Sequence, residues 1–228
     1  MNYTTEKIIA VLKAKGYPVR ESGLRDYDLN LVGIRSNTGT TNSFDDNLCV
    51  FWKFNGKWTI RVFPCTTDPG KTALNTPQNP KGTAIVKEGY YPKLWQIGLH
   101  QGKYKALKQA GNVVVFRDND KDGMLDMTPG TEQTGVFGIN CHRANENGKS
   151  IQVDGWSAGC QVLQNKQINN PDNQMVRVHE FDYFMHLCDM KVAKLNGEFF
   201  DYALINEKDF PIAPNTAPAI ASNTAPSA

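Results

Sequence analysis

Residues 48–63 read LCVFWKFNGKWTIRVF, and this stretch decides the fold class. Two apolar runs, 48–54 and 58–63, flank the dipeptide Asn55-Gly56. Asn and Gly tolerate the positive backbone φ angles that a two-residue hairpin turn requires, so Asn-Gly between apolar runs is a strong hairpin signal. The stretch therefore predicts a pair of antiparallel strands.

Strand patterns also dominate the sequence outside this hairpin. Leu29, Leu31 and Ile34 nearly alternate, and further strands are predicted at 83–91, 112–116, 135–142, 160–163 and 199–205. Helices are predicted at 8–14, at 104–110 and at 181–195, each followed by a glycine-containing stop. Residues 65–82 are rich in Thr, Pro, Asn and Gly and predict a loop. We expect a mainly-β protein with a few helices (α+β).

Length and composition indicate one domain with small additions. The chain has 228 residues, of which 40% are hydrophobic and 10% aromatic, enough for a real core. We expect an N-terminal helix and lead-in at 1–27 and a catalytic domain at 28–210. Residues 211–228 are rich in Pro, Ala, Ser and Thr and should form a disordered tail.

Charge and hydropathy exclude two classes of partner. The net charge is +2 with no basic block, which argues against nucleic-acid binding. The longest apolar run near the start, 8–12, is too short for a membrane span or for the core of a signal peptide. We therefore expect synthesis in the cytoplasm without a signal peptide, and no membrane span.

The five cysteines cannot all pair within the chain, and no C-x-x-C motif is present. A disulfide framework or a zinc site is therefore a poor prediction, and most of the cysteines should be small buried hydrophobic residues. Cys160 differs, because it ends the run Ser157-Ala158-Gly159-Cys160. Small residues let the backbone approach a substrate closely. A nucleophilic cysteine also needs a base, and His142 follows an apolar run that predicts a rigid strand.

This pattern resembles the L,D-transpeptidase (YkuD-like) catalytic domain. That family carries a His, a variable loop and then Ser/Thr-His-Gly-Cys, usually followed by an apolar residue and Arg. Here His142, Ser157, Gly159 and Cys160 match the motif, and residues 76–83, TPQNPKGT, resemble its Thr-Pro-x-Gly element. The resemblance implies a mixed β-sandwich, Cys160 as nucleophile, His142 as base, and peptidoglycan stem peptides as substrates. No cofactor is expected for catalysis.

Departures from the motif modify this expectation. Ala158 stands in place of the family's second His, Val162 in place of its Arg, and Arg143 follows the first His. A hydrolytic enzyme is therefore favoured over a cross-linking one. The chain also looks like proteins of phages and prophages, which implies a lytic enzyme acting at the bacterial cell wall, with a virion or a holin as a further partner. The candidate substrate-binding residues are Arg143, Trp156, Ala158, Gln161 and His100. His100 is alternatively an ordinary packed or surface histidine.

An acidic loop predicts a structural calcium site. The pattern D-x-D-x-D-G-x-x-D places oxygen ligands at the spacing of a calcium loop. The candidate ligands are Asp118, Asp120, Asp122, Met124 and Asp126. The bidentate acid of a complete EF-hand would fall at Pro129, and Glu132 could replace it only if the loop bulges. The alternative is a solvent-exposed turn rich in Asp and Gly.

Two other functions remain open at this point. One is a papain-like wall peptidase of the NlpC/P60 or CHAP kind, with Cys160 and His179 as the catalytic pair. Those families place the cysteine at a helix start, whereas the residues after Cys160 predict a strand. The other is a non-catalytic, calcium-stabilised module that binds a virion or the cell wall.

Overall fold

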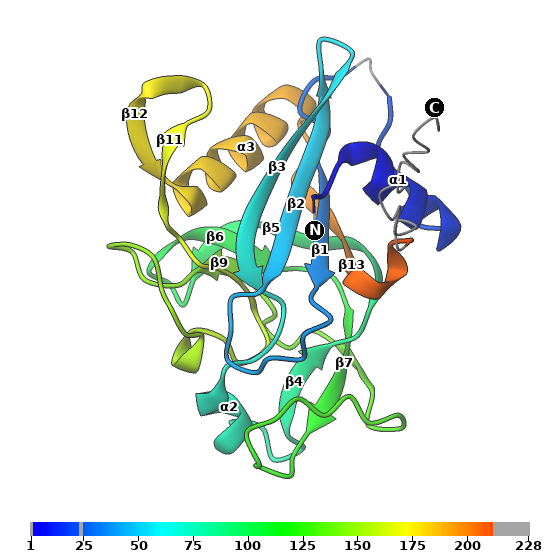
Figure 1. The fold of residues 1–228 in the computed structure, drawn as a ribbon, viewed down its shortest axis with the longest axis vertical. Helices are drawn as coiled ribbons and strands as arrows, with labels where there is room; N and C mark the ends of the chain where they lie inside the picture. The colour runs from blue at the N-terminus through cyan, green and yellow to red at the C-terminus, as the bar shows by residue number, and fades with distance from the viewer. Residues whose placement is uncertain (1, 23–24, 212–228) are drawn as a thin grey trace, which may run out of the picture.

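The computed structural model describes residues 2–22 and 25–211 (Figure 1). Beyond Pro211, the predicted tail 211–228 lies outside these residues. The helices are α1 (Thr5–Ala14), α2 (Lys71–Asn75) and α3 (Glu180–Leu195), and the 3-10 turns are η1 (Asp154–Trp156) and η2 (Glu207–Asp209). The strands are β1 (Asn30–Arg35), β2 (Asp46–Phe54), β3 (Lys57–Thr66), β4 (Thr83–Val86), β5 (Gly89–His100), β6 (Tyr104–Gln109), β7 (Val113–Asp118), β8 (Gln133–Gly135), β9 (Cys141–Arg143), β10 (Gln161–Leu163), β11 (Gln167–Asn170), β12 (Asn173–His179) and β13 (Phe199–Asn206). The prediction of a mainly-β fold with a few helices is confirmed.

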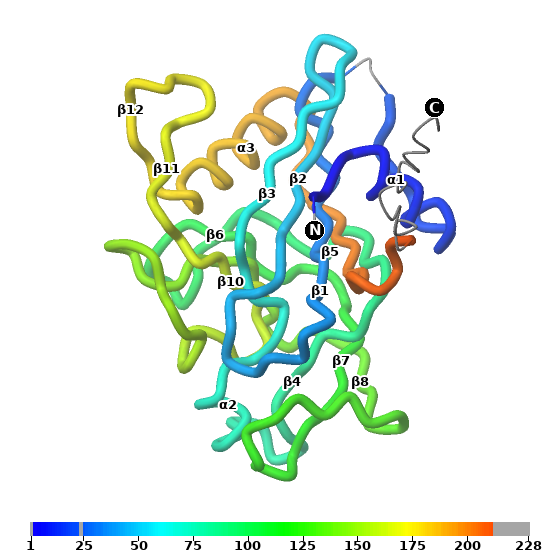
Figure 2. The backbone as a smooth tube through the Cα atoms, in the orientation of Figure 1, coloured from blue at the N-terminus to red at the C-terminus, as the bar shows by residue number. Residues whose placement is uncertain are grey.

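Eight strands close into a barrel in the order β1-β13-β5-β6-β9-β10-β3-β2. Two neighbouring pairs, β1 with β13 and β9 with β10, run parallel, and the others run antiparallel. The small sheet β4-β7-β8 lies below the barrel in Figure 2. The hairpin β11–β12 projects from the barrel at the upper left. A closed barrel takes the place of the expected sandwich, because closure pairs the edge strands that an open sheet would leave exposed.

The predicted hairpin is confirmed as β2 and β3. Phe54 pairs with Lys57, and the turn residues Asn55 and Gly56 have φ angles of 48° and 74°. Two successive positive φ angles are the signature of the type I′ turn that Asn-Gly favours. The helix at the N-terminus is also confirmed, and Gly16, with φ of 71°, follows its end.

Four local predictions differ from the structure. Residues 104–110 form strand β6 rather than a helix, because pairing with β5 and β9 inside the barrel outweighs local helix propensity. The predicted strand 83–91 divides between β4 and β5, which belong to different sheets. The predicted loop 65–82 contains the end of β3 and the short helix α2. The run 136–140 is not part of a strand.

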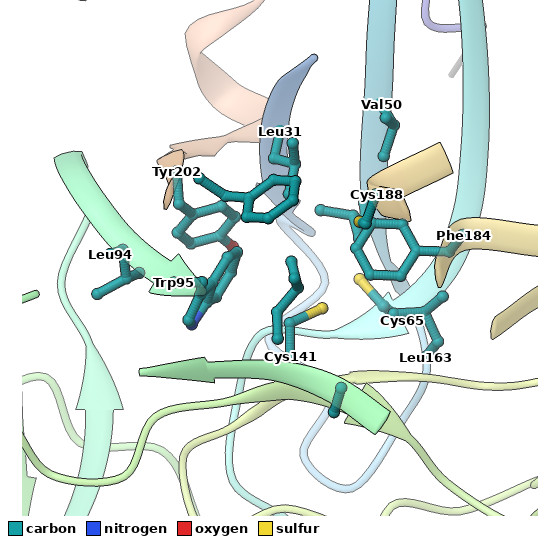
Figure 3. Close-up of a cluster of buried hydrophobic side chains, with 14 of the residues drawn as sticks. Leu31, Val50, Cys65, Leu94, Trp95, Cys141, Leu163, Phe184, Cys188 and Tyr202 are labelled. Carbon is teal, nitrogen blue, oxygen red and sulfur yellow. The ribbon is translucent and has the colours of Figure 1, made fainter. Parts of the chain in front are cut away.

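The barrel interior and helix α3 form the main core. Figure 3 shows Cys65, Cys141 and Cys188 among large buried side chains from several strands and α3. Trp95 is fully buried and donates its indole N–H to the Ile139 carbonyl at 2.8 Å. Cys141 has no exposed surface, so its predicted place in the core is confirmed.

Helix α1 covers the outside of the barrel with a second apolar cluster. Ile8 and Leu12 pack with Val32, Ile34 and Phe51, so β1 is buried on both faces. Within the described part of the chain, the helices are all too short or too polar to cross a bilayer.

Candidate active site

The parallel pairing of β9 with β10 brings the two candidate catalytic residues together. Cys141 pairs with Gln161 and His142 pairs with Val162, and the Gln161 N–H donates to the Asn140 carbonyl at 2.9 Å. Cys160 therefore lies beside Asn140, one residue before β10 begins. Cys160 and His142 both line one cleft of about 640 Å³, which we call the first cleft.

The first cleft is lined by five parts of the fold. These are the segment from α2 to β4, the end of β5 with its turn, the end of β7, the segment that leads into β9, and η1 with the turn after it. The lining residues are Ala73, Gln78, Asn79, Pro80, Gly82, Thr83, Ala84, His100, Gln101, Arg117, Val136, Phe137, Gly138, Ile139, Asn140, His142, Gly155, Trp156, Ala158 and Cys160. This is room for a short peptide, within the size of ordinary ligand sites.

Cys160 is held by backbone groups of the neighbouring segment. Its Sγ accepts the Asn140 N–H at 3.4 Å and donates to the Gly138 carbonyl at 3.4 Å. Burial raises the pKa of the Cys160 thiol to about 11, and the Asn140 N–H opposes that rise. The resting group at neutral pH is therefore the thiol. Cys160 is partly accessible, whereas the other four cysteines are buried.

His142 is oriented by a backbone carbonyl. Its Nδ1 lies 2.8 Å from the Arg143 carbonyl oxygen, so this hydrogen-bond network assigns the proton to Nδ1 and leaves a lone pair on Nε2. The Tyr104 hydroxyl donates to the same carbonyl at 3.2 Å and lies 3.2 Å from Nδ1. Burial, and secondarily His100, lowers the pKa of His142 to about 3. His142 is therefore neutral at pH 7, with the lone pair of Nε2 unprotonated.

His100 stacks on His142 with ring centroids 3.9 Å apart and planes 24° from parallel. The Asn140 side-chain amide lies 3.1 Å from His100 Nδ1, and its oxygen accepts the Gln109 N–H at 2.9 Å. This orientation makes Nδ1 of His100 an acceptor and places its proton on Nε2. Burial, then Lys103, lowers the pKa of His100. His100 lines the first cleft, which is where a substrate-binding residue would lie.

Ser157 and Gly159 shape the turn that presents Cys160. The Ser157 hydroxyl donates to the Cys160 carbonyl at 2.9 Å and accepts the Gly159 N–H at 3.1 Å. Gly159 has φ of +117°, and a Cβ there would lie 2.5 Å from the Ala84 carbonyl oxygen. The Gly159 N–H is thus already engaged, whereas the Cys160 N–H has no acceptor among the described residues. At this turn, the Cys160 amide is therefore free to donate to a bound group.

The predicted substrate-binding residues divide into three groups. Trp156 and Ala158 line the first cleft. Arg143 lines an adjoining second cleft of about 520 Å³ and pairs with Glu146 at 2.6 Å. The prediction for Gln161 is wrong, since the residue is 2% exposed and its amide bonds the Thr67 carbonyl and the Tyr202 hydroxyl. Strand alternation turns its side chain away from the face that Cys160 occupies.

Comparison with protein-family models, with curated proteins and with solved structures found no match to this chain. The resemblance to L,D-transpeptidases therefore rests on the motif residues themselves.

Sequence reasoning missed three residues of the site. The predicted helix at 104–110 gives no reason to place Tyr104 beside His142, where the structure has it. Asn140 bonds Cys160 through its backbone and His100 through its side chain, and its position two residues before His142 could have indicated a shared face. Arg117 lines the first cleft, but no local pattern marks it.

The papain-like alternative finds little support in this geometry. Cys160 precedes strand β10 rather than a helix. His179 precedes α3, its Nδ1 lies 3.4 Å from the Asn165 carbonyl, and it lines neither cleft.

The acidic loop brings three of the predicted ligands together. One carboxylate oxygen each from Asp120, Asp122 and Asp126 lies within 4.8 Å of the others. Asp118 is 2% exposed, and its Oδ2 accepts the Asp126 N–H at 3.0 Å. Glu132 cannot complete the set, because Lys87 at 2.9 Å and the Gly130 N–H at 2.7 Å engage its carboxylate. The donor set fits a weak, partly hydrated calcium ion, for which Met124 could add only its backbone carbonyl.

Proposed function

We propose that this chain is a cysteine acyl-transfer enzyme of the L,D-transpeptidase type that cleaves or remodels peptidoglycan stem peptides at the bacterial cell wall. The observation that carries the proposal is that His142, on β9, and Cys160, directly before the paired strand β10, line one cleft. The tautomer of His142 adds support, because its free Nε2 is the atom that a general base uses. Membership of the L,D-transpeptidase family belongs to the same proposal.

The reaction begins with attack of Cys160 Sγ on a peptide carbonyl. His142 Nε2 takes the thiol proton as the C–S bond forms, and then delivers it to the leaving amine as the C–N bond breaks. The product is a thioester on Cys160 and a free amine. Water then attacks the thioester to give a carboxylic acid, or an amine attacks it to give a new amide, and either step regenerates the thiol.

The surrounding groups suit the charges that develop in this reaction. The free Cys160 N–H is the donor for the oxyanion of the tetrahedral intermediate. His100 offers an Nε2–H in the same cleft, and it would serve in place of the family's second His, whose position Ala158 occupies. The two clefts meet at His100, His142 and Trp156. One cleft would hold the acyl donor and the other would admit water or the acceptor.

We favour hydrolysis over cross-linking. The residue at the family's Arg position is Val162, which is fully buried in an apolar cluster and cannot bind a substrate carboxylate. A lytic enzyme of the phage type, associated with a virion or a holin, fits this preference. Calcium would be a structural partner and would take no part in the acyl transfer.

Incubation of the protein with purified peptidoglycan fragments, followed by mass spectrometry, tests this function. We expect shortened stem peptides, and a thioester adduct on Cys160 when a slow substrate is used. Cys160→Ser should abolish the products, and His142→Ala should reduce their rate at least about 100-fold, since the nucleophile and its base act as a unit. Cys141→Ser, the matched control, should keep full activity because Cys141 lies in the core.

Full activity of Cys160→Ser would refute the proposal. The papain-like alternative, with Cys160 and His179 as the catalytic pair, predicts instead that His179→Ala abolishes activity and that His142→Ala is tolerated. The non-catalytic alternative predicts that no fragment changes mass and that Cys160 reacts with thiol reagents as slowly as the buried cysteines.

A further inference from the structure

One lining residue of the first cleft carries a permanent charge. Among the described residues that form this cleft, Arg117 is the single Arg, Lys, Asp or Glu side chain. The remaining lining residues are apolar, neutral and polar, or histidines with lowered pKa values. Whatever enters the cleft therefore meets one positive charge and no protein carboxylate.

Arg117 is buried without an anionic partner. Its residue is 8% exposed, and no carboxylate of residues 2–22 or 25–211 forms a salt bridge with it. Arg35, which is buried to a similar degree at 6% exposure, instead pairs with Asp68 at 2.8 Å. A buried charge is costly unless it is paired, so the contrast marks Arg117 as a site awaiting an anion.

The guanidinium is positioned by neutral groups. Nε donates to the Gln133 side-chain oxygen at 3.0 Å, Nη1 donates to the Gly82 carbonyl at 3.2 Å, and the plane lies over the Phe137 ring at 4.6 Å. Two of the five N–H groups are thus engaged and three are free. Nη2 makes no hydrogen bond with the described residues, yet it is not sealed from solvent. Burial also lowers the pKa of Arg117, which is consistent with a desolvated cation.

We propose that Arg117 is the anion-binding residue of the first cleft and that it receives a carboxylate of the substrate. The free N–H groups on Nη1 and Nη2 suffice for two parallel bonds to a carboxylate. A single cation in neutral surroundings matches a group of one negative charge better than a phosphate of two. The identity of the ligand as a peptide carboxylate rests on the proposed function, whereas the anion site itself does not.

Alkylation of Cys160 in the intact chain tests the site, because the other four cysteines are buried. Iodoacetate carries a negative charge and iodoacetamide does not, so the ratio of their rates at Cys160 reports the local potential. We expect Arg117→Gln to lower this ratio about 5-fold at low ionic strength, and the wild-type preference to shrink in about 0.5 M NaCl. Arg117→Lys should keep part of the preference. Arg177→Gln removes the same charge from an exposed strand and should change nothing.

A second measurement does not need a reactive cysteine. Titration with N-acetylalanine should perturb the Arg117 side-chain N–H signal in NMR spectra, and N-acetylalaninamide should not. An unchanged alkylation ratio in folded Arg117→Gln, or equal responses to the two ligands, would overturn the inference. If the wild-type protein left the peptidoglycan fragments unchanged, the proposed function would be refuted. The anion site would still stand, so the two failures are distinguishable.

Discussion

The neutral state of buried His142 makes folding stability depend on pH. Its pKa lies near 3 in the folded protein and near 6.5 when the side chain is free. Between these values the unfolded chain binds a proton that the folded protein excludes, so stability falls as the pH is lowered below 6.5. From pH 7 to pH 5 this single group should remove roughly 2 kcal/mol of the free energy of unfolding. Above pH 7 it should have no effect.

Urea unfolding at pH 7 and pH 5, followed by tryptophan fluorescence, measures this loss. The wild-type protein should lose about 2 kcal/mol more than His142→Gln over the same interval, since the variant keeps a similar shape without the titrating ring. His186→Gln controls for the loss of an exposed histidine. Because His100 stacks on His142, the comparison should be repeated in a His100→Gln background. Equal losses in the wild type and His142→Gln would refute the view that His142 is a neutral base at rest.

Three further predictions concern the turn, the loop and the core. Gly159→Ala should destabilise the protein by about 2–4 kcal/mol in urea unfolding, because φ of +117° and the 2.5 Å approach to the Ala84 carbonyl exclude a Cβ; an unchanged midpoint would contradict this. Addition of 5 mM Ca²⁺ should raise the melting temperature by about 2–4 °C in wild type and in the control Asp182→Asn, but not in Asp120→Ala; no rise in wild type would favour the solvent turn. Cys141→Ser should cost about 1–3 kcal/mol, since it buries an unpaired hydroxyl, and a neutral result would place Cys141 outside the core.

The motif around Cys160 could be predicted from the sequence because its requirements are local. The conformational preferences of individual residues explain three local features. These are the positive φ of Gly159 before the nucleophile, the Ser157 hydroxyl that caps the turn, and the Asn-Gly hairpin at 55–56. The helix stop at Gly16 belongs to the same class. Residue chemistry also marked Cys160 and His142 as a candidate pair, although 17 residues separate them in the chain.

Tertiary structure decided what depends on distant segments meeting. Strand β6 forms because β5 and β9 offer it hydrogen-bond partners, and that pairing carries Tyr104 to the Arg143 carbonyl beside His142. Closure of the barrel, the stacking of His100 on His142 and the inward turn of Gln161 arise in the same way. Arg117 has no local signature at all. Its charge becomes informative only when the fold buries it at the cleft of Cys160 without a carboxylate partner, because burial and pairing are properties of neighbours in space rather than in sequence.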